Sequence, residues 1–179
     1  MMRKNSAGFT LIEILIAIAI FSILSSIMIL NFRGDAKTKE LKNDCQKITD
    51  ALRQAQTMAL SGQQVTNGSG KSFIPDAYRF MPTCSGFPAT CKSFSLIASS
   101  SPSFMMSKTR LDKSEIYGLN SLVINFIPPS ADSSISVNGV ATTSVNIKVR
   151  HTQNNTLSRC VSYNSISGRI DILDISKCN

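Results

Sequence analysis

The feature that most constrains this chain is an uncharged apolar run near its N-terminus. From Ile14 to Phe32 there is no Asp, Glu, Lys or Arg. As a helix with a rise of about 1.5 Å per residue, this run spans about 28 Å, close to the thickness of a bilayer's hydrocarbon core. A secretory signal peptide would have its cleavage site after such a run. Here the run leads directly into a polar helical pattern, so we expect it to be retained as a membrane helix.

Glu13 stands at the start of that run, directly after Ile12. An ionisable side chain within a membrane segment costs about 3 kcal/mol or more, and by default it marks a functional site. The alternative is that Glu13 lies at the boundary of the lipid headgroups, where its charge needs no further explanation. The residues that precede Glu13 favour the functional interpretation.

These residues read Gly8-Phe9-Thr10-Leu11-Ile12-Glu13, after a short basic stretch that contains Arg3 and Lys4. The segment resembles the cleavage and methylation motif of type IV pilins and of the pseudopilins of type II secretion. The resemblance implies that a prepilin peptidase cuts between Gly8 and Phe9 and methylates the new amine of Phe9. It also implies that the partners are other pilins or pseudopilins and an inner-membrane assembly platform.

Cleavage would leave a cationic amine on Phe9, at the tip of an apolar helix. An unpaired buried charge is expensive, whereas a paired one is tolerated. We therefore hypothesise that Glu13 of a neighbouring subunit pairs with this amine in a filament, with the helix ends shifted by about one turn. Such a pair would set the stagger between subunits more than it adds stability.

The sequence divides into four parts. We assign residues 1–8 to a leader peptide, 9–32 to a transmembrane and filament-core helix, 33–62 to an amphipathic helix, and 63–179 to a β-rich soluble head. Basic residues flank the membrane run on both sides, so charge alone does not decide its orientation. The family resemblance and the cysteines favour a single-pass inner-membrane protein with its head in the periplasm, which later enters a pilus or pseudopilus.

Apolar residues continue at helical spacing beyond the membrane run. They recur at steps of three and four, which predicts an amphipathic helix with one stripe facing a core. The stripe consists of Leu41, Cys45, Ile48, Leu52, Ala55 and Ala59. Gly62 is the predicted C-terminal stop. Because Cys45 lies on the stripe, we expect it to be a buried free thiol rather than a redox or metal-binding residue.

From Gln63 onward Gly, Ser, Asn, Pro and Thr become frequent and the helical period ends. We expect an exposed linker over Val65–Asp76, and turns at Pro128-Pro129, Asn138-Gly139 and Ser167-Gly168. β-Prone runs are predicted at Tyr78–Met81, Phe94–Ala98, Ser121–Ile127, Ile135–Val137, Ser144–Arg150, Leu157–Tyr163 and Arg169–Ile175, the last two forming a hairpin. The expected fold is α+β and pilin-like, with the amphipathic half of a long N-terminal helix packed on an antiparallel sheet.

Four of the five cysteines lie in the predicted head, in two local pairs. We predict disulfides between Cys84 and Cys91 and between Cys160 and Cys178, which suits an oxidising compartment. The alternative is a zinc site, but the sequence offers neither a Cys-x-x-Cys pair nor a second His. The one His, His151, is expected at the surface. We expect no catalytic residues, no metal and no cofactor.

The formal net charge is +8. Basic residues crowd the C-terminal strands, among them Arg150, Arg159 and Arg169. One interpretation is a solvated rim. The other is a surface that contacts DNA, with an affinity that falls steeply as salt rises. Some T-type minor pilins bind DNA through a Gly-Arg-x-Arg element. The matching residues here, Gly168-Arg169-Ile170-Asp171, have an acid at the fourth place.

Three segments follow one another along the amphipathic helix and the head, and they are Ala51-Leu52-Arg53-Gln54-Ala55, Val123-Ile124-Asn125-Phe126-Ile127-Pro128, and Arg159-Cys160-Val161-Ser162-Tyr163 with Gly168-Arg169-Ile170. This order resembles the H-type minor pseudopilin and the T- and U-type minor fimbrial pilins. Major pilins often carry a Pro in the apolar helix, and residues 9–32 contain none. The resemblance therefore implies a structural minor subunit, not an enzyme, that assembles into a type II secretion pseudopilus and supports protein secretion. The alternative is a minor subunit of a type IV pilus, serving pilus biogenesis, adhesion, motility or DNA uptake.

Overall fold

The structure is a computed structural model of the 179-residue chain. It describes residues 10–85, 90–101, 103–130 and 132–178, with the backbone alone for residues 27–35. A single long helix, α1 (Leu11–Leu60), comes first among the described residues and is followed by short strands. The chain divides into two compact units, Met1–Thr38 and Lys39–Asn179. The first part of α1 thus belongs to one unit and its second part to the other.

The second part of α1 becomes the core-facing helix of the head because its apolar residues share one stripe. All six residues of the predicted stripe are fully buried. The helix ends in a Schellman motif around Gly62. The Gly62 N–H donates to the Ala59 carbonyl at 3.2 Å, and the Gln63 N–H donates to the Met58 carbonyl at 3.1 Å. Gly62 has a φ of 57°, which glycine adopts without steric cost. The predicted stop is confirmed.

Ten strands form one sheet in the described part of the chain, in the order β12-β11-β10-β6-β4-β3-β7-β8-β9, with β5 beside β4. Neighbouring strands pair in the antiparallel sense. Their bounds are β3 (Ala77–Ser85), β4 (Thr90–Ser99), β5 (Phe104–Arg110), β6 (Ser114–Tyr117), β7 (Leu122–Ile127), β8 (Asp132–Val137), β9 (Val140–Thr142), β10 (Ser144–His151), β11 (Asn154–Asn164) and β12 (Ile170–Asp174). The predicted hairpin of the last two strands is confirmed.

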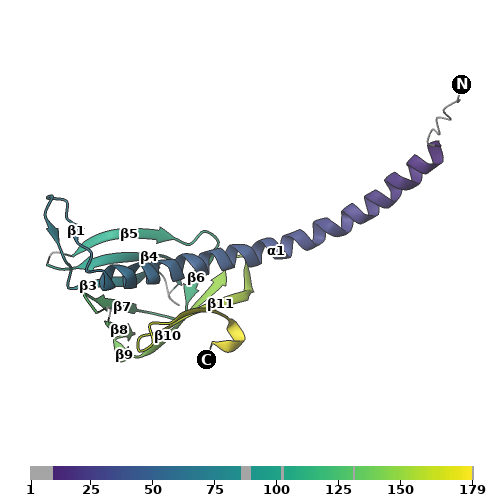
Figure 1. Ribbon diagram of the computed structural model, residues 1–179. Coiled ribbons are helices and arrows are strands. Elements are labelled where there is room, and N and C mark those ends of the chain that lie inside the picture. The colour runs from purple at the N-terminus through teal and green to yellow at the C-terminus, as the bar shows by residue number, and fades with distance from the viewer. Residues whose placement is uncertain (1–9, 86–89, 102, 131, 179) are drawn as a thin grey trace, which may run out of the picture. The chain divides into compact units, whose positions relative to one another are not determined.

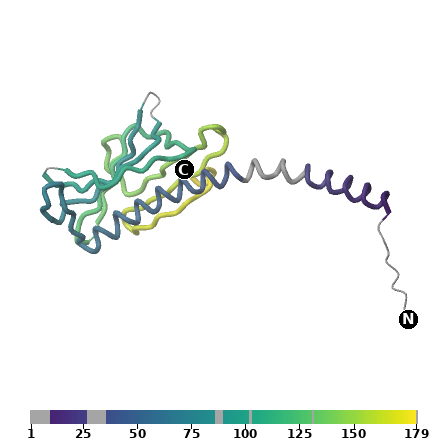
Figure 2. Tube along the Cα trace, turned by 90° about the horizontal axis from the view of Figure 1, so that it is seen from above, coloured from purple at the N-terminus to yellow at the C-terminus, as the bar shows by residue number. Residues whose placement is uncertain are grey.

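The core of the head lies between this sheet and the second part of α1, which crosses one face of the sheet (Figures 1 and 2). Strand β10 shows how the sequence builds that face, because Val145, Ile147 and Val149 are buried while the residues between them are partly exposed. Two aromatic pairs fill the core, Phe80–Phe94 and Phe126–Tyr163, with ring centroids 5.1 and 5.6 Å apart. Tilted pairs at these separations contribute about 1 kcal/mol beyond the area that they bury.

The exposed linker expected over Val65–Asp76 contains a hairpin instead. Strands β1 (Val65–Thr66) and β2 (Ser72–Phe73) pair with each other, and Val65 is buried. The Asn67 side chain accepts the backbone N–H groups of Ser69 and Lys71 at 3.1 and 3.0 Å. This turn, held by one Asn side chain, makes the polar stretch fold back on itself. The polar composition led to the prediction of a linker, because composition alone does not show that the Asn67 side chain hydrogen-bonds to the backbone of the turn.

Candidate functional site

The N-terminal end of α1 is closed by a capping box between Thr10 and Glu13. Thr10 precedes the first helical residue, and its hydroxyl oxygen accepts the Glu13 N–H at 3.3 Å. In return, one carboxylate oxygen of Glu13 accepts the Thr10 N–H at 2.9 Å and the Thr10 O–H at 2.8 Å. A Thr-x-x-Glu sequence satisfies two otherwise unpaired N–H groups of a helix start in this way. Glu13 therefore has a structural role within its own chain.

The helix that begins there is apolar all round and uncovered within its own unit. Its large apolar side chains are more than half exposed, and they are Leu11, Ile12, Ile14, Leu15, Ile16, Ile18, Ile20, Phe21, Ile23 and Leu24. The hydroxyl groups of Ser22 and Ser25 donate to the carbonyls of Ile18 and Phe21 at 2.8 and 2.7 Å, so their polarity is satisfied within the helix. Such a surface suits an apolar environment of lipid or of other helices.

Residues 3–29 match a known family motif, the prokaryotic N-terminal methylation motif. The chain carries a type IV pilin or pseudopilin signal. Gly8 and Phe9, the predicted cleavage and methylation residues, lie inside the match but outside the described residues. The motif implies processing by a prepilin peptidase, a membrane-anchored N-terminus before assembly, and assembly with other pilins.

No curated protein and no solved structure matches this chain. In the part of the chain whose side chains are described, no helix is both long enough and apolar enough to cross a membrane.

The head pairs each arginine of the predicted basic surface with a carboxylate. These ion pairs are Arg150–Glu115 at 2.7 Å, Arg159–Asp174 at 3.5 Å and Arg169–Asp171 at 2.6 Å. The Arg150 guanidinium also lies 5.1 Å from the centroid of the Tyr117 ring. Much of the positive charge at these positions is therefore balanced within the fold.

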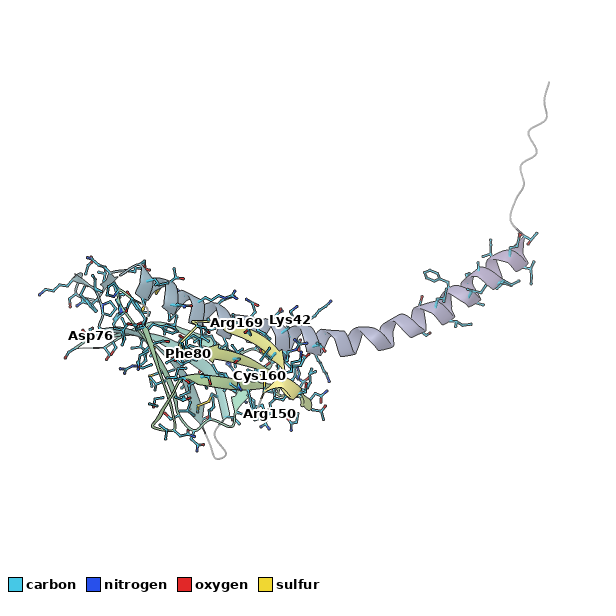
Figure 3. The ribbon with its side chains drawn as sticks, turned by 60° about the horizontal axis from the view of Figure 1, so that its bottom comes forward. Lys42, Asp76, Phe80, Arg150, Cys160 and Arg169 are labelled. Carbon is cyan, nitrogen blue, oxygen red and sulfur yellow. A yellow bond between two sulfur atoms is a disulfide. The ribbon has the colours of Figure 1, made fainter. Side chains whose placement is uncertain are left out.

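The same three arginines do not form one surface. Arg159 lies directly opposite Val149, and Ser158 opposite Arg150, in the β10–β11 register. Directly opposite residues share a face and consecutive residues alternate, so Arg150 and Arg159 lie on opposite faces of the sheet. Arg150 and Arg169 also lie apart (Figure 3). The sequence placed these residues on one surface because their spacing along the chain does not show the faces of paired strands.

Gly168 and Arg169 are the last two residues of the connection between β11 and β12. Gly168 has a φ of 65°, and a Cβ added there would lie 2.7 Å from Nε2 of Gln56. The backbone conformation therefore favours glycine, and the flexible Gln56 amide would have to move aside to admit a Cβ. Arg169 pairs with Asp171, the acid that stands at the fourth place of the Gly-Arg-x-Arg comparison.

The cysteines follow the sequence prediction. Disulfides join Cys84 to Cys91, across the β3–β4 pair, and Cys160 on β11 to Cys178, which directly follows the short 3-10 helix Ile175–Lys177. Cys45 is a buried free cysteine. Burial raises the pKa of its thiol to about 12, and this effect outweighs the opposing charge of Arg159. The thiol is therefore protonated and unreactive in the folded head.

Asp44 ties α1 to the loop between β5 and β6, a contact that the sequence analysis missed. Its Oδ1 accepts the Lys47 Nζ at 3.0 Å and the Asp112 N–H at 3.2 Å, and its Oδ2 accepts the Lys113 N–H at 3.1 Å. Burial by itself would raise the pKa of Asp44, but these hydrogen bonds outweigh it and lower the pKa below the usual value. The only sequence signal was an acid directly beside the apolar stripe.

His151 is fully buried rather than exposed, contrary to the prediction. Its Nδ1 accepts the Gln153 N–H at 3.1 Å. The proton must then be on Nε2, which donates to the Glu40 carboxylate at 3.1 Å. His151 ends β10 on the same alternating face as Val149, and that periodicity was the signal for its burial. The residue connects the end of β10 to α1.

Proposed function

We propose that this chain is a structural minor pseudopilin, assembled into a type II secretion pseudopilus, with no catalytic activity of its own. The observation that carries the proposal is the methylation motif at residues 3–29, which contains the capped start of an uncovered apolar helix. A helix with that surface is stable only among lipids or other helices. The lack of a Pro in residues 9–32 favours a minor or pseudopilin subunit over a major pilin.

The position of Glu13 in the capping box supports the proposed pairing of Glu13 with the Phe9 amine of a neighbouring subunit. Before assembly, the Glu13 carboxylate accepts the Thr10 N–H and so faces the start of the helix. After cleavage the Phe9 amine is the next group towards the N-terminus. It adds a positive charge to a helix end that is already partly positive. A neighbouring Glu13 that reaches this amine replaces lost hydration with an ion pair, which fixes the stagger between two subunits.

A clean deletion in the native host tests the proposal, with exoprotein secretion, piliation and DNA uptake scored side by side. Loss of secretion with intact pili is the expected result. Loss of pili or of transformation with normal secretion would contradict the pseudopilus and place the subunit in a type IV pilus. Complementation with Gly8→Glu, which should block cleavage by the prepilin peptidase, should fail to restore the lost activity.

A further inference from the structure

Strand β5 forms an open edge of the sheet. It pairs with β4 along Ser93–Ala98, and within the described residues no strand pairs with its other side. Figure 1 shows β5 at the margin of the sheet beside β4. An unpaired edge presents a row of N–H and C=O groups that can accept one more strand. Met105 on this strand is 56% exposed.

Three cations surround one shallow concavity next to this edge. Lys92, Ser93, Lys108 and Arg110 line it, and none of them is acidic. Lys108 lies opposite Ser95 and Arg110 opposite Ser93, so both cations stand on the same face of the β4–β5 pair. The small serines leave space between the long side chains. Among the described residues no carboxylate pairs with Lys92, Lys108 or Arg110, in contrast to Arg150, Arg159 and Arg169.

We propose that β5 is a docking edge for an extended segment of another protein subunit, which adds to the sheet as a strand and places two acidic side chains, two residues apart, at this cationic concavity. Lys108 and Arg110 are themselves two residues apart on one face, so carboxylates at alternate positions of an added strand match their spacing. The unpaired backbone gives affinity, and the charges select the partner and its register.

A second copy of this chain does not supply an edge strand with two acidic side chains two residues apart. Two β5 edges would bring Lys108 and Arg110 of both chains together, and their like charges would repel. The acidic edge strand β12 carries Asp171 and Asp174, which are three residues apart and so lie on opposite faces. Both are also already paired with arginines. Charged side chains on an edge can serve simply to prevent aggregation, but that role does not require three cations around one concavity.

A peptide-binding measurement on the full-length protein in non-ionic detergent tests this inference. The probe is a fluorescent Thr-Glu-Val-Glu-Thr-Glu-Val peptide. One control peptide has the same sequence with alternate backbone nitrogens methylated, and a labelled DNA duplex serves as a second control. We expect the probe to bind, and the methylated peptide to bind much more weakly because it cannot extend the sheet.

Charge-matched variants identify the site. Lys108→Gln/Arg110→Gln should weaken binding of the probe about tenfold, because two ion pairs are lost. Lys71→Gln/Lys177→Gln removes the same charge elsewhere on the head and should leave the affinity within about twofold. Circular dichroism checks that both variants are folded. Equal loss in the two variants would overturn the inference by showing that only net charge matters.

Other outcomes also contradict the proposal. If the probe failed to bind, or if the methylated peptide bound equally well, the proposed addition of a strand to β5 would be wrong. Binding of DNA but not of the probe, lost in Lys108→Gln/Arg110→Gln, would make the concavity a nucleic-acid site instead. The inference deepens the proposed function by naming a class of partner for the subunit. Peptide binding needs no filament, so its failure is distinguishable from a deletion that leaves secretion unaffected.

Discussion

We expect Glu13 to have two uses that depend on the state of assembly. In the single chain its carboxylate completes the helix start by accepting the Thr10 N–H. In a filament we expect it to meet the amine of a neighbour. The first use needs an acceptor oxygen, whereas the second needs a negative charge. Substitutions that separate the oxygen from the charge therefore distinguish the two roles.

Glu13→Gln should keep the cap and lose the ion pair. An amide oxygen still accepts the Thr10 N–H, as Gln does in other capping boxes. We expect normal processing and membrane insertion, but incorporation into filaments reduced at least about tenfold, as the loss of a buried charge pair implies. Immunoblots of sheared filaments and membranes measure this. Glu13→Ala removes both roles, and incorporation of Glu13→Gln at the wild-type level would show that the charge is not needed.

Asp44→Asn should destabilise the head by about 2 kcal/mol, because it places an amide against backbone N–H groups that need an acceptor. Since the folded pKa of Asp44 is lowered, its contribution is fully present above the unfolded pKa and is lost as pH falls through the folded pKa. The difference between wild type and variant should therefore shrink below about pH 4. Urea unfolding of the full chain in detergent, from pH 7 to pH 3, measures this difference.

The matched control for Asp44→Asn is Asp112→Asn. Asp112 is 73% exposed and also pairs with Lys47. Loss of an exposed ion pair costs at most about 1 kcal/mol. A cost for Asp112→Asn as large as that for Asp44→Asn would contradict the importance of the two backbone contacts of Asp44.

At the scale of elements, the helix followed directly from the sequence. The apolar stripe from Leu41 to Ala59 keeps one helical spacing and is followed by Gly62. Both features can be recognised within a short stretch of sequence. Strands β5, β6 and β9 were not predicted. The first contains a bulge at Met106, where the register shifts opposite Leu96 and Ile97, and this breaks the alternation. The other two have four and three residues, too few to show a period.

The sequence predicted those parts of the candidate site that depend on residues close together in the chain. Gly8, Phe9 and Glu13 belong to one contiguous segment, so their order along the chain was enough to propose their roles. The disulfide partners were also close in sequence, with separations of 7 and 18 residues. The contacts of Asp44 and His151 join residues far apart in the chain. No sequence period shows which loop or side chain a buried polar group will meet.

The need for glycine at position 168, between β11 and β12, can be tested by substitution. Gly168→Ala should cost about 1 kcal/mol for the left-handed backbone, and about 0.5 kcal/mol more because the flexible Gln56 amide must move aside and give up its hydrogen bond to the residue 168 carbonyl. Gly118→Ala is the matched control, because Gly118 has a φ of 77° and nothing within 4 Å of an added Cβ. Thermal unfolding of the variants measures both costs. Adding Gln56→Ala should relieve only the excess in Gly168→Ala, and no relief would contradict the steric part.

At the scale of the whole molecule, Cys45 reports on the opening of the core. Two disulfides leave Cys45 as the free thiol, and burial with a pKa of about 12 protects it. We expect no labelling by a maleimide under native conditions and one labelled thiol per chain in denaturant without reductant. Mass spectrometry counts the labels. Native labelling as fast as that of a small thiol would contradict the buried position.

The contacts of Glu40 and Asp44 have a mechanical consequence for the head. Leu, Ile and Ala along the rest of α1 pack without direction, so a slide of about one turn would still bury an apolar stripe. The two carboxylates tolerate no such slide, because Asp44 accepts N–H groups from one loop and Glu40 binds the imidazole at the end of β10. When tension is applied along α1, these contacts at the entry of the helix into the head would be strained first. We expect these contacts to resist a displacement of the helix along the face of the sheet.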